Sequence, residues 1–227
     1  MNHPTSDYDA KGTRALLSCR QAVMASQSSS IPGFPLTSVI PVAVVDNHII
    51  MLLSDLAQHT RNIDMDNRVS LMMHDDQEQN WQAAHRLSIM GYVEPIDHEL
   101  HNMDKIRKNY FRIHPELNDF DQHMDFRFWL LRPMRFRLIA GFGQVRWLEQ
   151  INCQLFDLDE EDHQKINTIL IEHRTAVSQL LQASKYGLQI IESGRVIFLS
   201  FRQPVKSVAG LLVQLSTGAY NTVTETR

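Results

Sequence analysis

Residues 36–53 read LTSVIPVAVVDNHIIMLL, which is two apolar runs rich in β-branched side chains with the pair Asp46-Asn47 between them. Runs of this kind are typical of strands, and a two-residue turn of this type closes a hairpin. The same texture recurs in further stretches: residues 21–26, 68–74, 85–93, 126–131, 136–140 and 143–147. Six or more antiparallel strands with few long helices predict a closed or nearly closed β-barrel, because closure removes exposed edges.

The residue pattern changes from strand-like to helical at Asp157. Residues 157–162 are an acidic helix start, which suits the positive end of a helix dipole. Positions that recur at helical spacing then predict one helix with a buried stripe: Ile166, Leu170, His173, Val177 and Leu180. A hairpin over residues 188–200 and a last helix over 204–215 follow. The sequence therefore predicts a loose N-terminus over residues 1–13, a barrel over 14–156 and a small α/β appendage over 157–227.

Composition excludes several classes of protein. The chain has 22 lysines and arginines against 26 aspartates and glutamates, scattered along its length, whereas nucleic-acid binding needs a clustered basic face. The N-terminus lacks the layout of a signal peptide, and no apolar run reaches the roughly 18 residues of a membrane span. The expected location is the cytoplasm. Cys19 and Cys153 lack the spacing of a zinc site or a disulfide framework, so both are expected as reduced thiols.

Several segments together resemble one known family. They are Ser54-Asp-Leu-Ala-Gln-His59-Thr-Arg61-Asn62, Arg68-Val-Ser70-Leu-Met-Met73, Arg86-Leu87, Asp125-Phe126, Gly141-Phe-Gly-Gln144 and the acid-flanked His163 of residues 158–166. This set resembles the FMN-binding split-barrel proteins related to pyridoxamine 5′-phosphate oxidase, and within them the heme-utilisation branch. The resemblance implies a mainly β fold with some helix, an FMN-binding split β-barrel followed by the small α/β appendage.

The resemblance also implies a heme site. His163 matches the axial ligand of the shorter heme-degrading members, and Asp125 would accept the proton on the other imidazole nitrogen, which orients the ring and strengthens it as a donor. In the family these two residues come from different protomers, so the resemblance implies a homodimer with its cofactor at the subunit interface. The alternative for His163 is a packing or capping role on an amphipathic helix.

Polar residues of the same segments are candidates to hold an anionic cofactor. Arg86 presents a planar fork that suits heme propionates or an FMN phosphate. The other candidates are His59, Arg61, Asn62, Ser54 and Ser70; each has a surface or strand-end role as its alternative. His173 is the surviving histidine of a segment found in longer relatives, and either it or His163 can be the iron ligand on sequence grounds.

The leading hypothesis is a heme-binding protein that opens the porphyrin ring with oxygen and releases iron, served by an electron donor for heme or flavin reduction. Such ring-opening chemistry belongs to the iron, while the protein supplies ligation and access. The first alternative is an FMN-binding oxidoreductase, which would not need His163. The second is a heme or flavin carrier without turnover. Whether the chain is an enzyme is open at this point.

Overall fold

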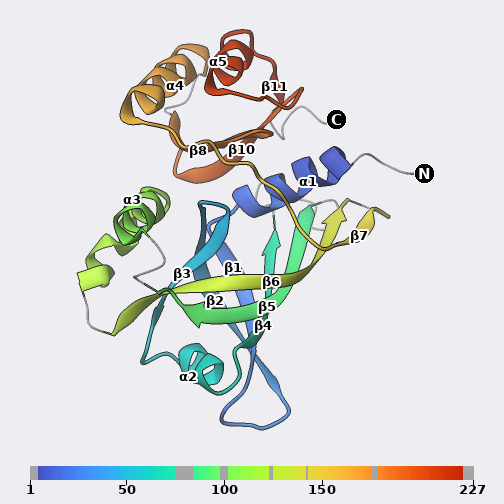
Figure 1. Ribbon diagram of the computed structural model, residues 1–227, viewed down its shortest axis with the longest axis vertical. Coiled ribbons are helices and arrows are strands. Elements are labelled where there is room, and N and C mark those ends of the chain that lie inside the picture. Colours follow the sequence, from blue (N-terminus) through green and yellow to red (C-terminus); the bar gives the residue numbers. More distant parts are fainter. Residues whose placement is uncertain are drawn as a thin grey trace. The chain divides into compact units, whose positions relative to one another are not determined.

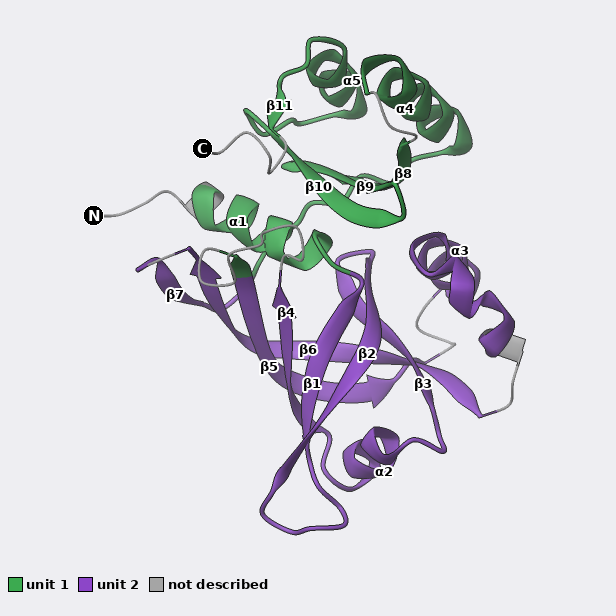
Figure 2. Cartoon of the chain, turned by 180° about the vertical axis from the view of Figure 1, so that it is seen from behind, with its two compact units in different colours: residues 1–19, 75–85, 151–227 green, residues 20–74, 86–150 purple. Residues whose placement is uncertain are grey.

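A computed structural model describes residues 5–74, 84–97, 102–122, 125–141, 143–174 and 178–221. The chain divides into two compact units, shown in different colours in Figure 2. Unit 2 holds residues 20–74 and 86–150, and unit 1 holds residues 1–19, 75–85 and 151–227. The domain limits predicted at residues 13 and 156 stay a prediction; the contact-based division differs because it joins the N-terminal residues to the C-terminal segment.

Unit 2 is a closed barrel. Its sheet has the strand order β3-β2-β1-β4-β5-β6-β7, and β3 also pairs with β6, so six strands close and β7 is an extra strand (Figure 1). The strands are β1 (Gln21–Gln27), β2 (Pro35–Val45), β3 (His48–Ser54), β4 (Arg68–His74), β5 (His85–Pro95), β6 (Phe126–Ala140) and β7 (Val145–Leu148). The predicted mainly β barrel is confirmed.

The β2–β3 hairpin forms where the sequence predicts it. Asp46 and Asn47 have φ of 49° and 62°, which is the left-handed backbone that a tight hairpin turn needs. Val45 is paired with His48 across the turn, and the register continues to Val42 opposite Met51. Alternate side chains from these strands enter the barrel core, which includes Ile40, Val42, Met51 and Leu53.

Three short helical segments accompany the barrel strands: α2 (Gln58–Met65), α3 (Met103–Ile113) and the 3-10 helix η1 (Pro115–Gln122). The α3 helix begins at Asn102, whose side chain accepts a hydrogen bond from the Lys105 N–H. Its Tyr110 is buried and accepts from the Leu52 N–H at 3.2 Å, which joins the helix to β3. Residues 98–101, shortly before this helix, lie outside the described part of the chain.

Unit 1 contains a four-stranded antiparallel sheet in the order β11-β10-β9-β8. Helices α4 (Glu160–His173) and α5 (Val208–Ser216) lie on one face of it (Figure 2). The strands are β8 (Ser178–Ser184), β9 (Gly187–Glu192), β10 (Arg195–Phe201) and β11 (Tyr220–Asn221). Its core includes Leu170 from α4, Leu211 and Leu215 from α5, and Ile190 from β9.

Two predictions differ from the structure. Residues 5–17 form helix α1 (Thr5–Leu17), where the sequence predicted a loose segment up to residue 13; burial of Thr13, Ala15 and Leu17 accounts for the order. The helix predicted to continue to Leu180 is wrong, because α4 ends at His173 and Leu180 belongs to β8. Val177 and Phe142, which the sequence analysis also used, lie outside the described residues.

None of the helices in the described part of the chain is long and apolar enough to cross a membrane.

Candidate functional site

Ser54 and Asp125 meet where β3 and β6 begin to separate. Ser54 is the last residue of β3 and is paired with Phe126, so Asp125 lies just beyond the paired region. The Asp55 N–H donates to the Asp125 carbonyl at 2.6 Å and extends the ladder by one bond. The Ser54 hydroxyl donates to Asp125 Oδ2 at 2.9 Å. Two candidates that are 71 residues apart in sequence are thus in direct contact.

Helix α2 follows Ser54 directly and is attached to the same turn. The Thr60 hydroxyl donates to the Ser54 carbonyl at 2.6 Å. Its neighbour His59 is half-buried, and burial lowers the pKa of its imidazole. The Nε2 atom of His59 is buried and has no hydrogen-bond partner among the described residues. Helix α2 therefore carries a neutral imidazole with an unpartnered buried nitrogen at His59, the residue before the Thr60 that binds the Ser54 carbonyl.

Asn62 has a structural role. It is fully buried, and its amide donates to Ser26 Oγ at 2.9 Å. Its Oδ1 accepts from the Ser29 N–H at 2.9 Å, from the Ser29 hydroxyl and from the Gln58 amide. These bonds join α2 to the end of β1 and the residues that follow it. The amide's donor and acceptor are both engaged within the chain.

The remaining barrel candidates are dispersed. Arg61 is exposed on α2. Arg86 begins the barrel part of β5, where it is paired with His74. Ser70 lies in the middle of β4, between Ala25 on one side and Met90 on the other. The structure therefore brings Ser54, Asp125 and the α2 turn together, and leaves Arg86 and Ser70 at other points of the sheet.

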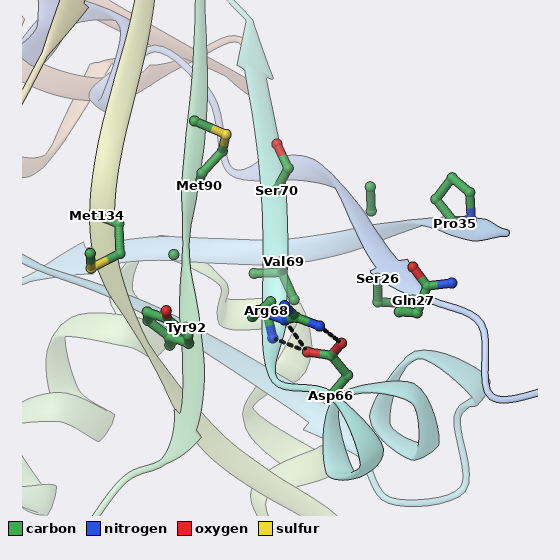
Figure 3. A pocket seen from close by; sticks show the side chains of 12 residues that line it. Ser26, Gln27, Pro35, Asp66, Arg68, Val69, Ser70, Met90, Tyr92 and Met134 are labelled. Atoms are coloured by element: carbon green, nitrogen blue, oxygen red, sulfur yellow. Dashed lines mark hydrogen bonds and ion pairs between the residues drawn. The ribbon is translucent and has the colours of Figure 1, made fainter. Parts of the chain in front are cut away.

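A hollow of about 600 Å³ lies over the strand faces around Ser70 (Figure 3). The small residues Ala25 and Ser70 form its centre, because β1 and β4 place them opposite each other. Larger side chains surround them: Gln27, Arg68, Met90, Tyr92 and Met134. Its lining combines apolar side chains with the Arg68 guanidinium and the Asp66 carboxylate.

Arg68 in this hollow is paired with Asp66. Its Nε donates to Asp66 Oδ1 at 2.8 Å and a second nitrogen donates to Oδ2 at 2.5 Å, as the dashed lines in Figure 3 mark. These bonds lower the pKa of Asp66 to about 2. Both groups are therefore charged at neutral pH, and an anion that binds Arg68 has to compete with the Asp66 carboxylate.

His163 belongs to the other unit. Asp159 caps helix α4 by accepting from the Asp162 N–H at 2.8 Å, and Glu160, Glu161 and Asp162 form the acidic first turn that the sequence predicts. The His163 N–H donates to the Asp159 carbonyl at 3.1 Å. Its side chain is 7% exposed, whereas His173 at the end of the same helix is exposed.

Arg68, Met90 and Tyr92 line the hollow but were not predicted as site residues. All three belong to predicted strands, and the alternation of outward and inward residues along a strand separates them from the core. Arg68, Ser70 and Met72 point outward, whereas Val69, Leu71 and Met73 are buried. The pairing of Arg68 with Tyr92 and of Ser70 with Met90 brings the two strands' outward residues together.

A profile of the family described as "CREG, beta-barrel" matches residues 4–157, which is more than half of the chain. The chain belongs to the CREG β-barrel family. This family is part of the FMN-binding split-barrel clan, which confirms the relationship that the sequence motifs indicated.

Relatives of this CREG β-barrel chain include heme proteins. The heme oxygenase HutZ of Vibrio cholerae is 26% identical over 138 residues, which is 60% of this chain and 78% of HutZ. A heme binding protein from Mycobacterium smegmatis has a TM-score of 0.59 at 19% identity and covers 96% of this chain and 99% of its own. A protein of unknown function from Agrobacterium tumefaciens has a TM-score of 0.70 at 15% identity, with 94% and 95% covered. These two structures support the fold.

Proposed function

We propose that this chain binds heme between two copies of itself, with His163 of one protomer as the iron ligand and Asp125 of the other as the partner of that imidazole. The similarity to HutZ supports heme as the ligand. The observation that carries the residue assignment is the Ser54–Asp125 contact, because it leaves a fixed carboxylate beside the α2 turn. An imidazole that donates to a carboxylate is oriented by it and becomes a stronger metal ligand.

The residues near this contact fit heme. The bare Nε2 of His59 is buried, and its lowered pKa keeps the ring neutral, so it can accept a hydrogen bond from a bound group. Arg61 is exposed on the same helix, where a guanidinium can pair with a propionate.

The outward face of the barrel is the proposed contact between the two copies. It exposes apolar side chains that a monomer normally covers: Val39, Met72, Met90, Tyr92, Met134, Val145 and Trp147. Contiguous apolar surface of this kind marks a protein or ligand contact. A two-fold contact would present the same face from both protomers.

Bound heme supplies the redox chemistry, which in the presence of an electron donor and oxygen opens the porphyrin ring and releases iron. The chain's part is to hold and orient the heme. His163 provides the ligand nitrogen, Asp125 holds the ring proton on the other nitrogen, and His59 accepts a hydrogen bond at the edge of the site. The appendage that carries α4 brings the ligand.

A flavin-binding oxidoreductase is the second candidate, and the hollow over Ser70 favours it. The hollow is flat at Ala25 and Ser70, and Arg68 stands at its edge. Arg68 and the Ser70 hydroxyl would bind a phosphate while the strand face packs against a planar ring. In that case neither His163 nor Asp125 would contribute to binding.

Parallel titrations of the purified chain with hemin and with FMN, followed by absorbance, test the proposal. We expect saturation at one heme per subunit and a loss of affinity on the order of 100-fold in His163→Ala, since even outer partners of a ligand contribute 10–100-fold. His173→Ala is the matched control on the same helix and should bind as the parent does. Tight FMN binding with weak heme uptake that His163→Ala leaves unchanged would contradict the proposal.

A further inference from the structure

The Ser54 hydroxyl is held in one orientation. It accepts a hydrogen bond from the Leu56 N–H at 3.1 Å and donates its single proton to Asp125 Oδ2 at 2.9 Å. A serine hydroxyl has one proton to donate. Because the Leu56 N–H approaches the oxygen from the turn, that proton is directed toward the carboxylate.

The Asp125 carboxylate is therefore held at one oxygen. Among the residues that the structure describes, Asp125 accepts two hydrogen bonds. The Ser54 hydroxyl donates to its side-chain Oδ2, and the Asp55 N–H donates to its main-chain carbonyl. Oδ1 accepts from no described group. A carboxylate with one oxygen fixed and one oxygen available is arranged to accept a further N–H.

The neighbouring carboxylate, Asp55, is paired with Arg127. Asp55 accepts from Arg127 Nε at 2.7 Å, in a pair that lies across the same two strands. Its charge is paired with the guanidinium, which makes Asp55 the weaker acceptor for an incoming imidazole. Of the two acids at the junction of β3 and β6, Asp125 is the one without an ion pair among the described residues.

We infer that Ser54 is a positioning residue that acts through Asp125: it fixes the carboxylate so that the other oxygen accepts the N–H of the iron-ligating His163. The inference rests on the proposed heme function. It also changes the role that the sequence suggested for Ser54. A hydroxyl engaged with both Leu56 and Asp125 is not free to donate to a cofactor phosphate.

Heme affinity and the iron–histidine stretch of the ferrous protein, measured by resonance Raman spectroscopy, test this role in Ser54→Ala and Asp125→Asn. A histidine that loses its carboxylate partner is a weaker donor, so both variants should move the stretch to lower frequency. Asp125→Asn should have the larger effect. We expect Ser54→Ala to bind heme about tenfold more weakly, the lower end of the 10–100-fold that loss of an outer partner costs.

Two variants separate positioning from general damage to the turn. Ser54→Thr keeps the hydroxyl and should restore the parent spectrum. Thr60→Val removes the 2.6 Å bond to the Ser54 carbonyl but leaves the Ser54–Asp125 bond, so it should leave the stretch unchanged. If Ser54→Ala does not fold, Ser54→Cys replaces it, because a thiol of similar size is a weak donor.

The outcomes are distinguishable. A parent spectrum in Ser54→Ala together with a shifted one in Asp125→Asn overturns the role of Ser54 and leaves the proposed function standing. An equal shift in Thr60→Val and Ser54→Ala also overturns it, since the turn and not the hydroxyl would then be responsible. Failure of the parent chain to bind heme through His163 overturns the proposed function itself.

Discussion

The two sheets of this molecule are both antiparallel, yet they differ in how far their apolar faces are covered. In unit 1 the apolar face of the β8–β11 sheet is covered by α4 and α5, and Leu170, Leu211 and Ile190 are at most 1% exposed. In the barrel, the inward face is equally well buried, but the outward face leaves Met90 39% exposed and Met134 61% exposed. A covered face stabilises a unit by itself, whereas an apolar face left in water indicates a contact with another molecule.

Binding is expected at the unit that leaves an apolar face uncovered. The unit 1 sheet is complete as it stands, and its candidate residue, His163, is on a helix that already packs into a core. The barrel has a hollow, an exposed apolar face and a held carboxylate. We therefore propose that the binding surface lies on the barrel and that α4 carries the iron ligand.

The largest expected effect is on the covered sheet. Leu170→Ala removes a side chain from the centre of the unit 1 core and should lower the free energy of unfolding by about 2–5 kcal/mol. Met90→Ala, on the exposed face, should change it by about 0.5 kcal/mol or less. Urea unfolding monitored by circular dichroism measures both. Equal losses would mean that the two faces are equally covered in solution.

A second effect concerns the way α4 is joined to the sheet. Arg174, which follows the helix, donates to both oxygens of Glu192 at 2.6 and 2.9 Å, and the Ser178 hydroxyl donates to the same carboxylate. Arg174→Ala leaves the carboxylate without its charged partner and should cost about 1–3 kcal/mol in urea unfolding. Lys165→Ala, which breaks an exposed pair with Glu161, is the control and should leave the urea midpoint unchanged.

A third effect concerns the exposed face. Met90→Asp introduces a charge where two protomers are proposed to meet, and should weaken the dimer more than tenfold, which is about 1.4 kcal/mol. Sedimentation velocity over a range of concentrations measures this. Val213→Asp, at a more exposed apolar position on α5, should leave the sedimentation unchanged. A parent chain that is monomeric at all concentrations would remove the basis of the shared site.

The smallest effect is a pH dependence of barrel stability. His114 is 1% exposed and makes bonds of 2.9 Å to the Val42 carbonyl and 3.3 Å to Glu116, with Tyr110 stacked on it and Arg20 beyond Glu116. Burial lowers the pKa of His114 despite these partners.

The sign follows from the direction of that shift. The unfolded chain takes up a proton near pH 6.5 while the folded chain does so only at lower pH, so stability falls as the pH drops below about 6.5. The slope from this group is at most about 1.4 kcal/mol per pH unit. His114→Gln should make urea midpoints between pH 7.5 and 5.5 flatter than those of the parent. A parent-like slope in the variant would assign the dependence to other groups.

Local features of the fold were predictable from the sequence. The Asp46-Asn47 turn and the limits of β4 follow from residue type and alternation, which are short-range properties. The predicted extension of α4 to Leu180 was wrong because it too used only short-range spacing. Helical spacing alone does not detect that Leu180 pairs with Ile190 and donates its N–H to Asn167 at 2.7 Å.

The candidate site was only partly predictable. Ser54 and Asp125 were both selected, but their contact depends on the pairing of β3 with β6, which is a tertiary property. Asn62 was selected as a cofactor contact, and no sequence pattern indicated the hydrogen bonds to Ser26 and Ser29 that occupy it. To predict that Arg68 and Tyr92 lie side by side, one would need the register between β4 and β5, which is a tertiary property.

The central claim is that one heme site is built from two protomers, and mixed dimers test it most directly. His163→Ala and Asp125→Asn homodimers are each expected to bind heme weakly. Unfolded together and refolded as a mixture, they form dimers in which one site combines an intact His163 with an intact Asp125. The account predicts heme uptake with the parent's absorbance spectrum and affinity at about one site per mixed dimer. A mixture that binds no better than the two homodimers alone would contradict it.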